Sequence, residues 1–326
     1  MTKHPFFIIG AQRSGTTLLR LLLNAHSDIA IPEEGTFWMP LLRKSRGDIS
    51  RRFSGWELKR CIEYLERNRQ FQLWGMESGE VFGQILKQDA YTLAEMMQEL
   101  YRVYAAKYNK GLWGDKTPSF FRMVSLLRAL FPDARFIHNI RDGRDVYLSW
   151  RQIDPSKRNI AVTALEWSYK VSRAKKELSF ADQSNVLEFK YEDLTHDPKR
   201  ELKKICSFLQ VDYEADMLNF WRTSRNFVGS THSQLISKPI TGISVNRWQR
   251  ELRPRELSCF ETVAGSTLES LGYTRSQEER RSFTPNVLLR LLYGVPLRAT
   301  RVLITAFLLN VSARFGLATS AAGGGN

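Results

Sequence analysis

A short polar turn, RSGTT, is the first part of the chain whose residue types suit binding chemistry; it interrupts the stretch FFIIGAQRSGTTLLRLLLNAH. An apolar run precedes the turn and an apolar segment with helical spacing follows it, so the turn joins a predicted strand to a predicted helix. Backbone N–H groups at a helix N-terminus lack intrahelical partners and attract anions. Gly15 lets the backbone approach a ligand closely, and Arg13 supplies the only full positive charge of the turn. Hydroxyl donors come from Ser14, Thr16 and Thr17. We therefore predict a site for a phosphate-like group.

The turn lacks a residue that nucleotide-hydrolysing phosphate loops require. Those loops place a lysine directly after the second glycine to reach the terminal phosphates, and a hydroxyl to hold magnesium. Here Thr16 follows Gly15. This difference favours an anionic ligand that is held without nucleotide hydrolysis.

A second candidate site occurs in RFIHNIRDGRDVYLSW, where a predicted strand at 135–140 runs directly into a helix. Arg141 follows the strand and Ser149 lies about two helical turns further on. An arginine at the carboxyl end of a strand, beside a helix N-terminus, is suited to clamp a second phosphate. Two such sites on one parallel sheet predict a ligand with two separated anionic groups.

The elements that must position these residues alternate between strands and helices. Besides 135–140, we predict strands in PFFII, GLWGDKTP and NVLEFKYEDL, and a mostly helical region at 41–110 whose apolar stripe packs in the core. Further helices are predicted to begin at Asp197-Pro198 and at Pro254, the latter ending before Gly272. This alternation predicts an α/β fold, P-loop-like, with three α/β/α layers around a central, mostly parallel sheet.

The composition changes near residue 276, so we predict a main domain at 1–275, a basic amphipathic extension at 276–317 and a disordered tail at 318–326. Arginines interrupt the apolar run of the extension, and Gly294 and Pro296 are predicted to split it; these arginines are Arg290, Arg298, Arg301 and Arg314. Packing against the domain or oligomerisation is one interpretation. A monotopic interfacial helix on anionic lipid is the other.

The chain has 326 residues and a formal net charge of +14, which suits nucleic acid, an anionic membrane or a small polyanionic substrate. No RNA-binding signature or zinc-finger spacing supports nucleic acid, which we therefore exclude as a partner. The three scattered cysteines predict a reducing compartment and no metal site. We see no signal-peptide h-region and no transmembrane run, so we predict a cytoplasmic protein, at the inner face of the membrane if the extension is interfacial.

Several of these segments together resemble the PAPS-dependent sulfotransferases, whose donor is 3′-phosphoadenylyl sulfate. RSGTTLLRLLLNAHSDIAIPEE is similar to their 5′-phosphosulfate loop, RDGRDVYLS to their 3′-phosphate motif, and KYEDLTHDP and SVNRWQRELRP to later parts of the family. The resemblance covers roughly residues 5–273 and is strongest to bacterial members and the protein-tyrosine sulfotransferase branch. It implies PAPS as co-substrate and a hydroxyl-bearing acceptor, without a metal.

The resemblance implies a role for each donor-site residue. Arg13 would lie beside the sulfuryl group, and Thr16 and Thr17 would hold the 5′-phosphate, within the turn that also contains Ser14 and Gly15. The remaining residues are Arg141 and Ser149 for the 3′-phosphate, Tyr191 near the adenosine, and Arg247, which closes over the donor and is preceded by Asn246 where the tyrosine branch often has serine.

The acceptor oxygen must lose a proton as it attacks sulfur, so a general base is needed. Glu34 matches the acidic residue of the tyrosine branch and is our predicted base, with Glu33 as its competitor. Lys116 matches a lysine that would stabilise charge on the transferring group; the alternative for Lys116 is a surface ion pair with Asp115. Structural roles are favoured for four of the five histidines, at positions 26, 138, 196 and 232.

We predict sulfuryl transfer from PAPS to a hydroxyl of an unidentified acceptor: a carbohydrate, a glycolipid or a small alcohol. Peptide tyrosine ranks lower, because such an enzyme would need secretory targeting. The acceptor pocket is predicted within 37–110 and around 225–245. The alternatives are a P-loop small-molecule or nucleoside kinase and a non-catalytic membrane-associated nucleotide-binding protein. The oligomeric state is left open.

Overall fold

The computed structural model of the chain describes residues 4–45, 48–76, 78–85, 87–222, 237–276, 287–298 and 300. By packing, the chain divides into two units. The first unit is Met1–Val146 with Tyr169–Arg247, and the second is Tyr147–Ser168 with Trp248–Asn326. The predicted boundaries at 275 and 317 stay predictions.

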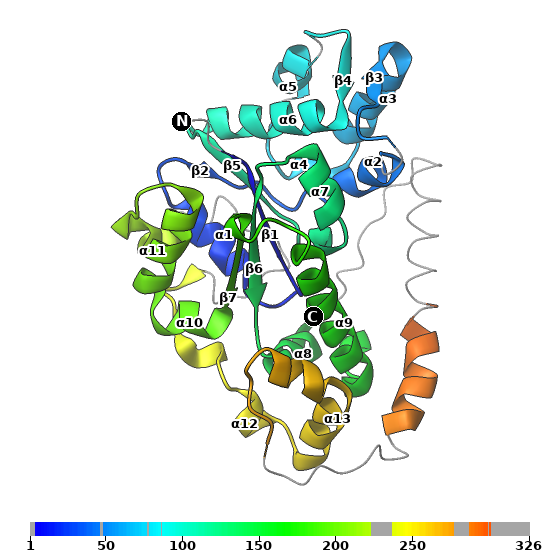
Figure 1. Ribbon diagram of the computed structural model, residues 1–326, viewed down its shortest axis with the longest axis vertical. Coiled ribbons are helices and arrows are strands. Elements are labelled where there is room, and N and C mark those ends of the chain that lie inside the picture. The colour runs from blue at the N-terminus through cyan, green and yellow to red at the C-terminus, as the bar shows by residue number, and fades with distance from the viewer. Residues whose placement is uncertain are drawn as a thin grey trace, which may run out of the picture. The chain divides into compact units, whose positions relative to one another are not determined.

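A five-stranded sheet forms the centre of the first unit, and each of its strand pairs is parallel. The strand order is β2-β5-β1-β6-β7 (Figure 1). The strands are β1 (Phe6–Gly10), β2 (Ile29–Ala30), β5 (Leu112–Lys116), β6 (Arg135–Ile140) and β7 (Val186–Lys190). The four strands predicted from the sequence are confirmed. The two-residue β2 was missed, because so short a strand leaves no pattern.

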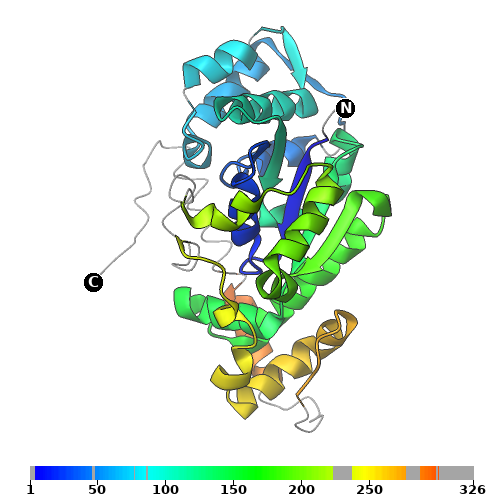
Figure 2. The ribbon, with the colours of Figure 1, turned by 90° about the vertical axis from the view of Figure 1, so that its left-hand side faces the viewer.

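Alternating side chains of β1 face two separate hydrophobic clusters, one on each side of the sheet. Phe7 and Ile9 belong to the cluster that includes α6 (Leu93–Lys107) and α7 (Val124–Leu130). Phe6 and Ile8 belong to the cluster that includes α1 (Thr16–Asn24) and α11 (Pro198–Leu209). Helices therefore cover both faces (Figures 1 and 2), and the predicted α/β/α layering is confirmed.

The region predicted as mostly helical contains α2 (Trp38–Lys44), α3 (Gly55–Glu66), α4 (Arg69–Gln72), α5 (Ser78–Ile85) and α6. The apolar stripe of α6 is buried, as predicted, so it packs in the core. The sequence did not reveal the antiparallel pair β3 (Arg52–Ser54) and β4 (Ala90–Thr92), because three residues are too few for alternation to be visible.

The second unit contains α12 (Trp248–Glu251), α13 (Pro254–Ser270) and a helix at 287–298. α13 begins at Pro254 and is followed by Gly272 at φ 73°, as predicted. The predicted split at Gly294 and Pro296 is wrong, because residues 287–298 are helical throughout. Gly294 lies close to Asn159, and the absence of a side chain at 294 permits this contact. The glycine therefore does not end the helix. Among the described residues, no helix is long and apolar enough to cross a membrane.

Candidate active site

The predicted site residues of the first unit follow four neighbouring strands of the sheet. The polar turn follows β1, Lys116 ends β5, Arg141 follows β6 and Tyr191 follows β7. All these strand pairs are parallel, so their carboxyl ends lie at one edge of the sheet. The chain leaves β1 toward β2 and later returns to the opposite side with β6, which makes this edge a topological switch point, where ligands of α/β proteins bind.

The polar turn is shaped as an anion site at the N-terminus of α1. Gly15 is the N-cap, with φ 89°, and no side chain caps the helix. Arg13 also has positive φ, 72°, so the turn curls tightly before the helix begins. The Ser14 hydroxyl is fully buried and has no hydrogen-bond partner among the described residues. A buried hydroxyl without a partner is costly, and a bound anion would satisfy it.

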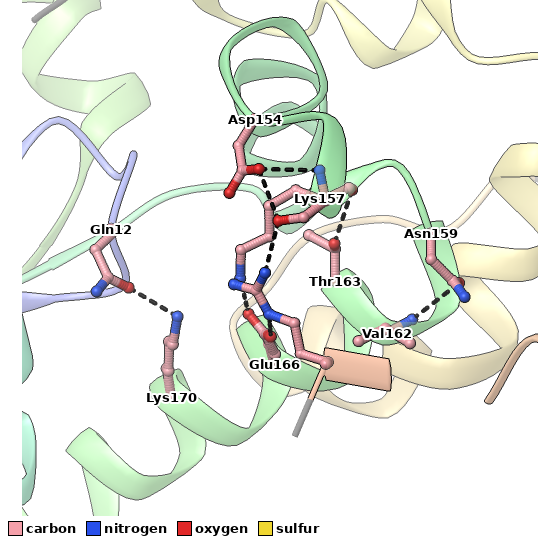
Figure 3. A network of polar contacts seen from close by, with 10 residues as sticks. Gln12, Asp154, Lys157, Asn159, Val162, Thr163, Glu166 and Lys170 are labelled. Atoms are coloured by element: carbon pink, nitrogen blue, oxygen red, sulfur yellow. Dashed lines mark hydrogen bonds and ion pairs between the residues drawn. The ribbon is translucent and has the colours of Figure 1, made fainter. Parts of the chain in front are cut away.

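Tyr191 covers the turn from the end of β7. A Cβ on Gly15 would lie 2.2 Å from Cδ2 of the Tyr191 ring, so only glycine fits at position 15. Thr16 and Thr17 are the first residues of α1, the former buried and the latter half-buried. The turn is also held from α9 (Ile160–Leu178), where Lys170 Nζ donates to Gln12 Oε1 at 2.7 Å (Figure 3).

Arg141 connects the turn to Tyr191. Its Nη1 donates to the Arg13 carbonyl at 3.0 Å, its Nη2 donates to the Ser244 carbonyl at 2.6 Å, and its guanidinium lies 4.4 Å from the Tyr191 ring centroid. Burial, and then repulsion from Arg141, lowers the pKa of Arg13. The two guanidinium groups therefore create a positive region that would favour an anion.

Lys116 and Glu34 form an ion pair at the same edge, with Nζ 2.6 Å from Oε1. The Lys116 side chain is 1% exposed and that of Glu34 is 37% exposed, so the carboxylate faces solvent and the ammonium lies beneath it. Burial lowers the pKa of Lys116, and Glu34 opposes that shift. The alternative of a surface pair with Asp115 is wrong, because Lys116 is buried and its partner is Glu34.

Asp115 in β5 and Thr117, which follows the strand, hold the backbone next to Glu34. Gly35 N–H donates to Thr117 Oγ1 at 2.8 Å, and a Cβ on Gly35 would lie 2.7 Å from both Asp115 Oδ2 and the Tyr101 hydroxyl. Tyr101 OH in turn donates to Asp115 Oδ2 at 2.5 Å, and burial raises the pKa of Asp115 to about 6. The sequence offered only the motif GDKTP as a signal for these contacts, and Tyr101 and Thr117 were missed as supporting residues.

Glu33 has a different environment from Glu34. Its Oε1 lies 2.7 Å from Nη2 of Arg20, a fully buried residue of α1 that also donates to the Pro32 carbonyl. Trp74 Nε1 donates to the Glu33 carbonyl at 2.9 Å. Glu33 thus fastens the loop to α1, while the carboxylate of Glu34 points to the sheet edge that carries Lys116.

Two of the histidines considered above, His26 and His138, have contacts of a structural kind. His26 bonds the Asp212 carbonyl at 2.8 Å, and His138 Nδ1 lies 2.7 Å from Glu188 Oε2 on β7. His196 ends α10 (Tyr191–His196) and is exposed, whereas position 232 lies outside the described residues. None of these contacts joins a histidine to the turn or to Glu34.

Two predicted donor residues are less directly connected to this cluster. Ser149 is buried on α8 (Gly143–Ile153) and belongs to the second unit, so its pairing with Arg141 stays a prediction. Arg247 is half-buried and ends the first unit. It follows Asn246, whose φ of 55° suits asparagine. Ser244, three residues before Arg247, accepts the hydrogen bond from Arg141.

The parallel sheet, its two helical layers and the polar turn between β1 and α1 at the carboxyl edge define a P-loop-like α/β/α protein. Residues 5–215 match the model of the Sulfotransferase family. This match spans more than half of the chain, so the chain belongs to the sulfotransferase family, as its motifs predicted.

Curated relatives agree with this assignment. Protein-tyrosine sulfotransferase A of Caenorhabditis elegans is 24% identical over 254 residues, covering 74% of this chain and 56% of that protein. Nodulation protein NoeE of Sinorhizobium fredii is 24% identical over 300 residues, covering 84% and 67%. An uncharacterized protein of Aquifex aeolicus is 25% identical over 257 residues, covering 76% of this chain. The chain spans only 31%, 56% and 46% of the first three curated relatives that it matches.

Solved structures support the fold. The sulfotransferase domain from the curacin biosynthetic pathway has a TM-score of 0.57 at 18% identity, covering 85% of this chain and 99% of that chain. The sulfotransferase domain from the Synechococcus PCC 7002 olefin synthase has a TM-score of 0.57 at 23% identity, covering 84% and 96%. At these identities the likeness concerns the fold alone.

Proposed function

We propose that this protein is a PAPS-dependent sulfotransferase that transfers a sulfuryl group to the hydroxyl of a carbohydrate, a glycolipid or a small alcohol. One observation carries the proposal: an uncapped helix N-terminus with the buried Ser14 hydroxyl, and a carboxylate–ammonium pair, Glu34 with Lys116, occur together at one edge of the sheet. Family membership supports the type of group transferred.

The residues of the turn suit a donor with two anionic groups. The N-terminus of α1 and the unpartnered Ser14 hydroxyl would bind the 5′-phosphosulfate, with Arg13 beside it. Arg141 would bind the 3′-phosphate, and Tyr191, against which Arg141 packs, would lie beside the adenosine. Within the same unit, Arg247 is proposed to complete this binding by analogy with the family.

The proposed chemistry divides between the two members of the ion pair. Glu34 accepts the proton of the acceptor hydroxyl while that oxygen forms a bond to sulfur. The bond from sulfur to the bridging phosphate oxygen breaks, and adenosine 3′,5′-bisphosphate leaves as an anion that needs no proton. Lys116, fixed beneath Glu34, stabilises the negative charge that develops on the sulfuryl and bridging oxygens.

Two other functions explain fewer of these features. A kinase would share the turn but would need a lysine where this chain has Thr16. A non-catalytic nucleotide-binding protein would share both anion sites, but it would have no use for Glu34 held against a buried lysine. Sulfuryl transfer uses all of them.

Adenosine 3′,5′-bisphosphate is expected to stabilise the protein against heat, because it presents both anionic groups of the donor. At a concentration of about one hundred times Kd, a ligand adds about 2.7 kcal/mol, which raises Tm by roughly 5 °C. Differential scanning fluorimetry measures this shift, with ATP and magnesium as the comparison. Stabilisation by ATP and magnesium but not by the bisphosphate would refute the proposal. Labelled PAPS offered to glycan, lipid and small-molecule fractions then identifies the acceptor.

Gly15→Ala is expected to impair the turn in two ways. Alanine is strained at φ 89°, and its Cβ would overlap the Tyr191 ring. We expect Tm to fall by roughly 3 °C or more and the affinity for the bisphosphate to fall by about tenfold or more. Gly79→Ala is the matched control, since Gly79 lies in α5 with open space around it. Equal bisphosphate affinity in wild type and Gly15→Ala would show that the turn does not bind the donor.

A further inference from the structure

One side of the helix at 287–298 is fixed within the second unit. Val287 is buried, and Asn159 Nδ2 donates to the Arg290 carbonyl at 3.0 Å. Arg298 donates to Glu166 Oε1 at 2.8 Å and to Ser156 Oγ at 2.7 Å.

The surface that receives this helix is itself well ordered by polar contacts. Glu166 also pairs with Lys157, whose carbonyl accepts from Thr163 Oγ1 at 3.0 Å (Figure 3). Gly294 permits the close approach, because a Cβ there would lie 2.3 Å from Asn159 Nδ2. The orientation of the helix on this unit is therefore defined by contacts along its whole length.

The other side of the helix exposes large apolar side chains. Their exposed fractions range from 41% to 74%, for Leu288, Leu289, Leu292, Tyr293, Val295 and Leu297. A surface helix normally turns polar residues outward, so this arrangement is the reverse of the ordinary pattern. A contiguous apolar face of this kind marks a surface that binds something.

Charge decides which partner suits this face. From residue 280 to the last residue, the sequence contains six arginines and no aspartate, glutamate or lysine. We propose that the exposed apolar face of 287–298 docks onto an anionic lipid surface, with its leucines inserted at the headgroup boundary and the exposed Arg290 near lipid phosphates. The helix lies in the plane of the surface, since its exposed leucines run along 287–298 while the opposite side of the helix is fixed to the second unit.

A second copy of the chain is the less suitable occupant. In a twofold-symmetric pair, each patch meets its own equivalent, so the two acid-free segments with their arginines would face each other. Like charges brought together in this way oppose association. An anionic bilayer, in contrast, complements both the apolar face and the positive charge.

The test is co-sedimentation of the full chain with vesicles of phosphatidylglycerol and phosphatidylcholine, compared with phosphatidylcholine alone. We expect binding to the anionic vesicles that weakens as salt is added. The double variant Leu289→Glu, Leu292→Glu should bind about tenfold or more weakly. The matched control is Leu73→Glu with Phe180→Glu, which places the same charges on similarly exposed apolar residues of the first unit and should bind like wild type. Circular dichroism checks that each variant is folded.

Three binding results would overturn the proposal: no binding of wild type to anionic vesicles, unchanged binding of the helix variant, or an equal loss of binding in both double variants. A fourth is a wild-type protein that forms dimers and binds no vesicles, together with a helix variant that is monomeric. The dimer is detected by light scattering after size exclusion. These assays do not use the sulfuryl donor, so their outcome is independent of the function proposed above.

Discussion

Glu34→Gln is expected to lower kcat by about 10²- to 10⁴-fold, because glutamine cannot accept the proton of the acceptor hydroxyl. Glutamine keeps the size of glutamate and still accepts a hydrogen bond from Lys116 Nζ, which lies 2.6 Å from Glu34 Oε1 in the native protein. Binding of adenosine 3′,5′-bisphosphate should therefore be preserved. Initial rates with labelled PAPS, together with calorimetric titration of the bisphosphate, separate the two effects.

Glu33→Gln is the matched control for this substitution, one residue earlier in the same loop. Glu33 pairs with the fully buried Arg20, so its replacement should lower Tm while the folded enzyme keeps its kcat. Glutamine at 34 with unchanged turnover would disprove the assignment of the base. A loss of turnover at 33 with normal Tm and normal bisphosphate binding would move that role to Glu33.

The second large effect is expected for Lys116→Met. Methionine fills a similar volume, but it removes the ammonium that would stabilise the charge developing on the transferred group, and kcat should fall by about 10²- to 10³-fold. The fold should tolerate this change, because a buried ammonium is itself costly and Glu34, 37% exposed, remains solvated. Turnover and Tm measured on the same preparation test both statements.

Lys110→Met provides the comparison at the opposite end of the same strand. Lys110 lies just before β5 and donates to the carbonyls of Asn24 and Ile29, and burial lowers its pKa to about 8. Its loss should reduce stability and leave kcat unchanged, since the amino end of β5 is remote from the carboxyl edge. Full activity in Lys116→Met, or equal losses of activity in the two variants, would contradict a specific role for Lys116.

The contacts around the ion pair also fix the position of Glu34 relative to Lys116. Thr117 holds the N–H of Gly35, and the Asp115–Tyr101 pair leaves no room for a side chain at that position. The residues around Lys116 in β5 thus hold the loop that carries Glu34. In the proposed mechanism, this arrangement keeps the base Glu34 and the ammonium of Lys116 at a constant separation, which favours the stabilisation of charge that develops only in the transition state.

The sequence by itself determined the local features. The turn before α1, the bounds of β6, the start of α11 at Pro198 and the start of α13 at Pro254 were all predictable. Each depends on residues close together in the chain: an apolar run, a glycine with positive φ, or a capping residue followed by proline. The family was predictable for the same reason, since its motifs are continuous segments.

The tertiary structure alone decided which of these segments meet. Lys116 and Glu34 are 82 positions apart, and they pair because β2, which precedes Glu34, lies next to β5 in the order β2-β5-β1-β6-β7. The same packing pairs Glu33 with Arg20 and leaves Glu34 at the sheet edge. The sequence alone does not distinguish the environments of these two adjacent glutamates. It also made 287–298 one helix across Gly294 and Pro296, through contacts with residues 156–166. Strand order and side-chain partners depend on distant parts of the chain, so a local sequence pattern does not predict them.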